Sequence, residues 1–301
     1  MKFTILVENS SNRDDLKAQH GLSIYIEYNE HKILLDAGQD DTFAQNAKVL
    51  NIDLSKVTEV ICSHAHYDHV GGMNTFCSLN KSASLYTYWD GKSDYLSTTH
   101  CNTGEKERKI GFYLNKEYSN RLRILYGTGV YSLCDGIWLV PIGSSSIKKY
   151  KFGQPYKNKT LFERCPNEKG MHNDTFNHEC AVVVKVAEKK YVIFNSCSHN
   201  GVLNTLDAVK KSIPEIKKEF ICAYVGGFHF PWQKGDLIAS EDSKNMTELV
   251  LAVKESVQKS KNSTGLYLYS GHCTGESAID YFISTLDTHF TRFSTGFTKK
   301  I

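Results

Sequence analysis

Hydrophobic and polar residues along the first sixty positions follow the spacings that strands and helices require. Residues 3–8, 22–28 and 31–36 resemble strands, and 22–28 alternates cleanly between the two kinds of residue. Residues 42–50 carry hydrophobic side chains at helical spacing and lead to a β-branched run over 57–62. The pattern therefore predicts a β-β-β-α-β opening.

The last third of the chain repeats these patterns, whereas the middle does not. The predicted elements after the middle are strands at 179–187, 190–195, 220–225 and 265–269, helices from 203, at 246–257 and at 279–286, and an edge strand within 289–297. Between about 80 and 177, strand-like runs at 84–89, 121–126 and 136–142 are separated by long polar stretches. Long loops of this kind are typical of lids and binding loops.

The stretch Ser63-His-Ala-His-Tyr-Asp-His-Val-Gly-Gly72 brings four metal-ligand types into six positions at the end of the 57–62 strand. In an extended loop, His64 and His66 project to the same side because side chains alternate. Asp68 and His69 begin a tighter segment that aims them at a second point. Imidazole nitrogen and carboxylate oxygen are ligands that Zn²⁺ accepts, and Fe or Mn tolerate the same set. The spacing of these ligands therefore predicts that two metal ions share this loop.

Three further predicted strands end in loops that carry a histidine: His199, His229 and His272. For each of these histidine-bearing loops, the alternative interpretation is a surface loop that binds nothing. Histidines placed at random would not prefer strand ends followed by small residues, so convergence on one sheet edge is the simpler explanation.

These motifs resemble the HxHxDH signature of the metallo-β-lactamase superfamily. The closer resemblance is to its dihydropteroate-synthase-like branch. It is carried, beside the histidine stretch, by residues 6–9, 20–23, 33–38, 197–201, 226–229 and 270–275. The resemblance implies an α/β fold, a four-layer αββα sandwich with metals at the edge between two sheets. It further implies a single domain over 1–301, with a weakly matching lid region at about 80–177.

The resemblance also assigns ligands. His64 and His66 would bind the first metal, Asp68 and His69 the second, and His272 falls where the superfamily has its last ligand of the second metal. The resemblance implies two divalent ions, for which we predict Zn²⁺, with Fe or Mn as alternatives.

The chain departs from the family pattern after the 190–195 strand. The superfamily usually has a bridging aspartate there, and here no aspartate is present. We choose His199 as a direct ligand, with Cys197 as a second candidate for the bridging position. For the third ligand of the first metal, His178 and Glu179 stay open beside His199.

Two other residues near these motifs have alternative interpretations. Asp36 ends its strand, and in the family this aspartate supports the active-site loops without binding metal, whereas the plain alternative is a turn-capping carboxylate. His20 either borders the site or begins the next strand, and we favour the second.

One concentrated basic segment interleaves lysines with aromatic residues, and it includes Lys148, Lys149, Tyr150 and Lys151. A solvated loop is the favoured interpretation. The alternative is a lid whose lysines meet a small anionic substrate.

The composition is that of an ordinary globular protein. The chain has 301 residues, 41% hydrophobic and 23% charged, and its net charge of +3 is too mild to predict a nucleic-acid partner. Nine cysteines without a CxxC motif predict reduced thiols. The first apolar run reaches Glu8 too soon for a signal peptide, and no run is long enough to span a membrane. We therefore expect a cytoplasmic protein without a membrane partner.

The sequence predicts a metallo-hydrolase that uses a binuclear site to activate water against an ester-type bond, with a phosphoester or phosphodiester as the favoured substrate. Asp68 would orient the water, and His229 is either a ligand, an acid that protonates the leaving group, or a plain loop residue. A pterin-related transferase of the resembling branch is the alternative. A metal-binding redox or sensory protein is a third, less favoured hypothesis.

Overall fold

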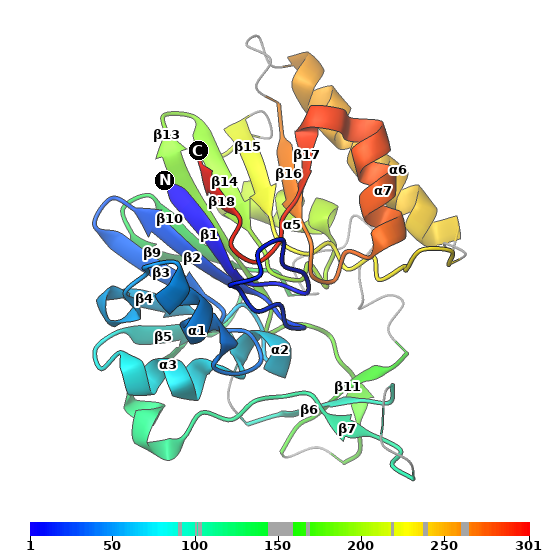
Figure 1. Ribbon diagram of the computed structural model, residues 1–301. Helices are drawn as coiled ribbons and strands as arrows, with labels where there is room; N and C mark the ends of the chain where they lie inside the picture. Colours follow the sequence, from blue (N-terminus) through cyan, green and yellow to red (C-terminus); the bar gives the residue numbers. More distant parts are fainter. Residues whose placement is uncertain are drawn as a thin grey trace. The chain divides into compact units, whose positions relative to one another are not determined.

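The computed structural model describes residues 1–89, 92–99, 101, 104–143, 159–166, 169–217, 220–236, 240–259 and 265–301. The chain divides into two compact units. Figure 1 labels their helices and strands. The first unit comprises Met1–Gly127, Gln154–Glu179 and Ser294–Ile301, and the second comprises Thr128–Gly153 and Cys180–Phe293. The prediction of a single domain over 1–301 stays a prediction.

A seven-stranded sheet with the order β18-β1-β2-β3-β4-β5-β8 forms the centre of the first unit. Its strands are β1 (Lys2–Val7), β2 (Ser23–Tyr28), β3 (His31–Leu35), β4 (Glu59–Ile61), β5 (Ser84–Thr87), β8 (Leu122–Ile124) and β18 (Thr298–Lys300). Strands β1 to β3 are antiparallel neighbours, and β3, β4, β5 and β8 run parallel. The last strand, β18, pairs antiparallel with β1 and closes this edge.

Short helices connect these strands and fill one core. They are α1 (Thr42–Val49), α2 (Tyr67–Val70), α3 (Met73–Leu79) and the 3₁₀ helices η1 (Leu54–Lys56) and η2 (Lys116–Arg121). Phe43 and Ala47 of α1 and Phe76 of α3 are fully buried in the cluster that covers the sheet. The predicted β-β-β-α-β opening is confirmed.

A separate four-stranded sheet with the order β12-β11-β6-β7 belongs to the first unit and was not predicted. Its strands are β6 (Asp94–Ser97), β7 (Arg108–Lys109), β11 (Leu161–Arg164) and β12 (His172–Asn173). Their two to four residues are too few for hydrophobic alternation to stand out from a polar background. Beside this sheet Trp89, Tyr95 and Ile110 pack against Ala65, so it supports the loop that carries the first histidines.

The second unit is built on a seven-stranded sheet with the order β17-β16-β15-β14-β13-β10-β9. Its strands are β9 (Tyr131–Cys134), β10 (Ile137–Pro141), β13 (Cys180–Ala187), β14 (Lys190–Phe194), β15 (Ile221–Val225), β16 (Tyr267–Ser270) and β17 (Phe290–Arg292). Strands β14 to β17 are parallel, and β9, β10, β13 and β14 pair antiparallel in that order.

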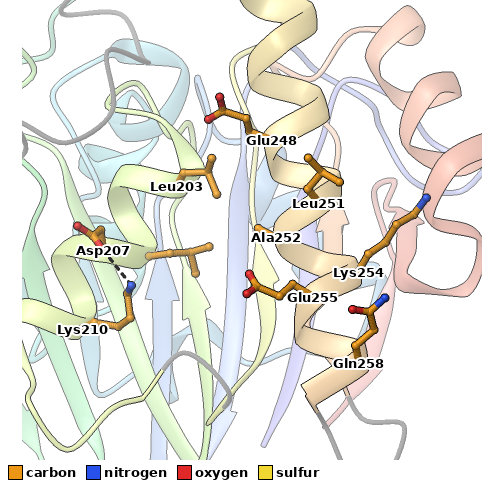
Figure 2. Close-up of a pocket in the computed structure, with 10 residues that line it drawn as sticks. Leu203, Asp207, Lys210, Glu248, Leu251, Ala252, Lys254, Glu255 and Gln258 are labelled. Atoms are coloured by element: carbon orange, nitrogen blue, oxygen red, sulfur yellow. Dashed lines mark hydrogen bonds and ion pairs between the residues drawn. The ribbon is translucent and has the colours of Figure 1, made fainter.

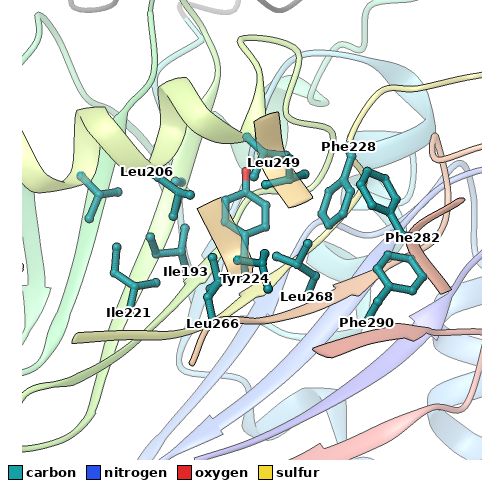
Figure 3. Packing of buried hydrophobic residues seen from close by; sticks show 14 of the residues in the cluster. Ile193, Leu206, Ile221, Tyr224, Phe228, Leu249, Leu266, Leu268, Phe282 and Phe290 are labelled. Carbon is teal, nitrogen blue, oxygen red and sulfur yellow. The ribbon is translucent and has the colours of Figure 1, made fainter. Parts of the chain in front are cut away.

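The helices of the second unit are α5 (Val202–Ser212), α6 (Ser240–Lys259), α7 (Glu276–Leu286) and η5 (Asp287–His289). Their apolar stripes pack with the sheet in one cluster, in which Phe228, Phe282 and Phe290 contact one another edge to face or stacked (Figure 3). The hydrophobic stripe predicted at 246–257 lies in this core, as the core-packing interpretation expects.

A groove of about 510 Å³ lies between α5 and α6 (Figure 2). Leucines such as Leu203 and Leu251 line it together with charged residues, and Asp207 accepts a 2.9 Å hydrogen bond from Lys210 at its side. None of its lining residues is a histidine or a cysteine. The metal chemistry predicted from the sequence therefore belongs elsewhere.

In the described part of the chain, no helix combines the length and the apolar character needed to cross a membrane.

Candidate metal site

The first four predicted ligands follow β4 and enter α2, as the sequence predicts. His64, His66 and His69 are buried, and Asp68 is partly exposed. The Tyr67 N–H donates to the carbonyl oxygen of Ile110 at 2.7 Å, which ties the loop to the segment beside the four-stranded sheet. This bond therefore fixes the backbone of the loop that carries the imidazoles.

Asp36 sets the orientation of two of these imidazoles. Its Oδ1 accepts the Ser63 N–H at 2.8 Å, and its Oδ2 accepts the Ser63 hydroxyl at 2.6 Å. Because the serine proton is used in this way, the Ser63 oxygen accepts from Nδ1 of His64, 2.8 Å away. Nδ1 of His69 lies 2.8 Å from Asp36 Oδ2 and donates to it. Both rings thus carry their proton on Nδ1 and present the lone pair of Nε2 to a metal.

The charges around His69 favour a cation. Burial by itself lowers the pKa of His69, but the charge of Asp68 and the hydrogen bond to Asp36 outweigh it and raise that pKa. One ligand atom each of Asp36, His64 and His69 lies within 4.8 Å of the others. Imidazole nitrogens with a neighbouring carboxylate are a donor set that suits Zn²⁺, so these residues fit the metal implied by the resemblance.

His66 belongs to a second buried cluster, with Asp174 and His178. Nε2 of His66 lies 3.4 Å from Asp174 Oδ2, and Nε2 of His178 lies 3.2 Å from Oδ1. Nδ1 of His178 accepts the Ala65 N–H at 3.1 Å. Burial alone would raise the pKa of Asp174, but the two imidazoles lower it, so the carboxylate is ionised. Since Nε2 of His66 faces this carboxylate, its lone pair for a metal is on Nδ1.

Asp174 was missed by the sequence reasoning, although the signal is local. The carboxylate stands four residues before His178 in a polar stretch that leads directly into β13. Both ring nitrogens of His178 contact protein groups, which favours a supporting role over the ligand role considered above. Glu179 is fully buried beside it, and its ligand role stays a prediction.

His20 lies elsewhere than the favoured interpretation placed it. Strand β2 begins at Ser23, and His20 precedes it in a bend. Its Nε2 lies 3.3 Å from Oδ2 of Asp68, so this exposed imidazole borders the ligand loop. The Leu22 N–H donates to the Asp68 carbonyl at 3.2 Å and holds the two segments together.

The second unit places its predicted site residues directly after parallel strands. Cys197 and His199 follow β14, His229 follows β15, and His272 follows β16. The rings of His199 and His229 lie 4.4 Å apart between centroids. Cys197, His199 and His272 are buried, and His229 is half-buried. Within this unit the predicted convergence at the ends of β14 and β15 is therefore observed for His199 and His229.

The backbone at these strand ends takes an unusual conformation. Ser198, His229 and His272 have φ values of 53°, 52° and 53°, in the left-handed region that non-glycine residues seldom adopt. Each such position costs about 1–3 kcal/mol, and positions of this kind gather at functional sites. Hydrogen bonds hold the loops in place, since the Ser198 hydroxyl donates to the Gly227 carbonyl at 2.6 Å. The strain is a second indication, independent of residue type, that these loops are functional.

The basic segment with Lys148, Lys149, Tyr150 and Lys151 lies outside the described residues. Its predicted contact with substrate stays a prediction.

Comparisons with known proteins agree with this architecture. The family model of the metallo-β-lactamase superfamily matches residues 16–86. The 7,8-dihydropterin-6-methyl-4-(β-D-ribofuranosyl)-aminobenzene-5′-phosphate synthase of Methanocaldococcus jannaschii is 27% identical over 311 residues, which cover 98% of this chain and 94% of that relative.

Solved structures agree as well. Tm1679, described as a metal-dependent hydrolase of the β-lactamase superfamily, aligns over 100% of this chain and 99% of its own with a TM-score of 0.75 at 22% identity. The metallo-β-lactamase fold protein YhfI from Bacillus subtilis covers 99% of both chains with a TM-score of 0.53 at 11% identity. The predicted fold class, α/β of the metallo-β-lactamase type, is confirmed.

Proposed function

Because the chain has the metallo-β-lactamase fold and the model of that superfamily matches residues 16–86, we propose that it is a metal-dependent hydrolase. In this proposal it cleaves an ester-type bond, a phosphoester or phosphodiester, in a small anionic substrate. The observation that carries the proposal is the orientation of His64 and His69 by Asp36, which presents two Nε2 lone pairs from a buried loop. Metal-binding histidines commonly donate their other ring N–H to a carboxylate, which fixes the tautomer and the ring orientation, and this is the arrangement seen here.

The proposed ligands are those that the sequence assigns. They are His64, His66, Asp68 and His69 on the first unit, whereas the ligand roles of His199, His272 and Cys197 stay predictions from the sequence. Two divalent ions, Zn²⁺ in our proposal, would supply Lewis acidity that lowers the pKa of a bound water and neutralises charge on phosphoryl oxygens.

The chain's own residues would handle the protons. The Asp68 carboxylate lies 3.7 Å from Nε2 of His69, where it would accept a hydrogen bond from the attacking water and orient that water. His229, half-buried beside His199, would protonate the leaving-group oxygen.

The test combines metal content with catalysis. Elemental analysis of the protein purified without chelator should find two equivalents of metal per chain. His66→Ala should lose at least half of that metal and nearly all hydrolysis of bis(p-nitrophenyl) phosphate. His31→Ala is the matched control, because this imidazole pairs with Glu59 on the same sheet, away from the ligand loop. Full metal content and full activity in His66→Ala would refute the proposal.

A pterin-related transferase is the second candidate, favoured by the match to the archaeal synthase over nearly the whole chain. In that reaction a carbon–nitrogen bond would form between a pterin methyl carbon and an arylamine. The carbon–oxygen bond to a diphosphate leaving group would break, and the amine proton would pass to a base. The metals would bind the diphosphate.

Product analysis separates the two candidates. Hydrolysis in ¹⁸O-labelled water places one labelled oxygen in the product. The transferase yields a condensed product only when a hydroxymethyl-dihydropterin diphosphate and an arylamine phosphate are both supplied. A condensed product without solvent oxygen would replace the hydrolase proposal by the transferase.

A further inference from the structure

The buried carboxylate of Asp174 contacts one backbone N–H and two imidazole rings. Its Oδ1 accepts the Phe176 N–H at 2.7 Å and contacts Nε2 of His178 at 3.2 Å. Its Oδ2 lies 3.3 Å from the same Nε2 and 3.4 Å from Nε2 of His66. The side chain is 1% exposed, so water does not satisfy these oxygens in place of protein groups.

The proton positions in this cluster follow from its contacts. The Ala65 N–H can donate to Nδ1 of His178 only if that nitrogen carries a lone pair. The proton of His178 is therefore on Nε2 and points at Asp174. Nε2 of His66 lies 3.4 Å from Oδ2 of the same carboxyl group, so the contact assigns a donated proton to that nitrogen as well.

Asp174 and His178 contact the ligand loop at two adjacent residues, His66 and Ala65. Asp174 contacts the ring of His66 directly, and through His178 it holds the backbone of Ala65, which lies between the two histidines of the first pair. The aromatic rings of Tyr95 and Phe176 pack against His178, with centroids 4.5 Å and 6.0 Å from that of the imidazole.

We propose that Asp174 is a positioning residue of the metal site: it fixes the ring of His66 and, through His178, the backbone of the loop that carries His64 and His66. The inference rests on the proposed metal site and deepens it, since it adds a residue that binds neither metal nor substrate. It also assigns His178 to the support of the loop.

The first measurement needs no variant. Long-range ¹H–¹⁵N correlation spectra of the metal-free protein distinguish protonated from unprotonated ring nitrogens. Nε2 of His66 and of His178 should both be protonated, with Nδ1 unprotonated. An unprotonated Nε2 on either ring would overturn the inference, whatever the metal content of the protein.

The second measurement uses Asp174→Asn, whose amide can donate to His66 Nε2 and thereby favour the wrong tautomer. Zn²⁺ affinity, measured by competition with a chromophoric chelator, should fall about tenfold to a hundredfold. The matched control is Asp242→Asn. Asp242 is a buried carboxylate of the second unit that accepts a hydrogen bond from Trp232 Nε1 at 3.1 Å. Its Zn²⁺ affinity should equal that of the wild type.

The outcomes separate this inference from the proposed function. If the wild type binds no metal, the function proposal fails while the proton positions still test the role of Asp174. If the wild type binds metal and Asp174→Asn binds it equally well with the wild-type tautomers, the positioning role is wrong and the metal site stands.

Discussion

At the scale of single residues, two buried carboxylates on the first unit determine which nitrogen each imidazole presents. Asp36 places a proton on Nδ1 of His69 directly and on Nδ1 of His64 through Ser63. Asp174 faces Nε2 of His66 instead. In the proposed site, neighbouring histidines of one loop would therefore bind a metal through different nitrogens, because their supporting carboxylates face different ring atoms.

Replacing Asp36 tests this arrangement. In Asp36→Asn one carboxylate oxygen becomes an NH₂ group that cannot accept, so the bonds from the Ser63 N–H, the Ser63 hydroxyl and His69 Nδ1 cannot all persist. We therefore expect Zn²⁺ affinity to fall about tenfold to a hundredfold. Isothermal titration of the metal-free protein measures it. Asp53→Asn is the control, because this exposed carboxylate caps η1 away from the loop. Unchanged affinity in Asp36→Asn would contradict the role assigned to Asp36.

The glycine pair after the ligands permits a close backbone approach. A Cβ at Gly72 would lie 2.4 Å from the Ala37 carbonyl oxygen and 2.5 Å from that of Asp40. Gly72→Ala should therefore lower the free energy of unfolding by about 1–3 kcal/mol, measured by urea denaturation. Gly129→Ala, where a Cβ meets no atom within 4 Å, should change it little. Equal free energies of unfolding for the two variants would show that the backbone around Gly72 accommodates a Cβ without an energetic cost.

At the scale of elements, the strand ends position the chemistry and the helices after them begin with polar contacts. In α1, Asp40 accepts from the Thr42 N–H at 2.9 Å and from the Thr42 hydroxyl at 2.7 Å. Burial raises the pKa of Asp40, but the bonds from Thr42 and Gln19 outweigh it, so the net pKa is lowered.

Removal of the Asp40 side chain, which accepts these bonds from the position before the N-cap residue Asp41, should have a pH-dependent effect. Asp40→Ala should destabilise the protein by about 0.5–1.5 kcal/mol at pH 7. Because the folded pKa of Asp40 is lowered, its contribution is present above the unfolded pKa of about 4 and is lost as pH falls through the folded pKa. Thermal unfolding curves of both proteins should thus converge at acid pH. A difference that stays constant with pH would contradict the assigned ionisation.

Local patterns predicted the elements of the fold well, and long-range contacts explain what they missed. The loop from Ser63 to Gly72 was found because its ligands lie side by side in sequence. Asp174 has a local signal, its place four residues before His178, but its contact with His66 spans 108 positions, and periodicity carries no information about such pairs. The pairing of β18 with β1 was missed for the same reason.

At the scale of the whole molecule, a bound metal should stabilise the folded chain. A ligand that binds only the native state adds about 4 kcal/mol when its concentration is 1,000 times Kd. Chelation should therefore lower the Tm of the wild type by several degrees in differential scanning calorimetry. His66→Ala should respond less to the chelator, and identical curves for the wild type with and without chelator would argue against a tightly held metal.

The pairing of β18 with β1 has a consequence for synthesis. Strand β1 is synthesised long before its neighbour on one side, Thr298–Lys300, and the Ile301 N–H donates to the Met1 carbonyl at 3.0 Å. Until Thr298–Lys300 have been made, β1 presents an open edge, which in general invites pairing with other chains. The sheet of the first unit therefore gains β18 only after the second unit, up to Phe293, has been synthesised.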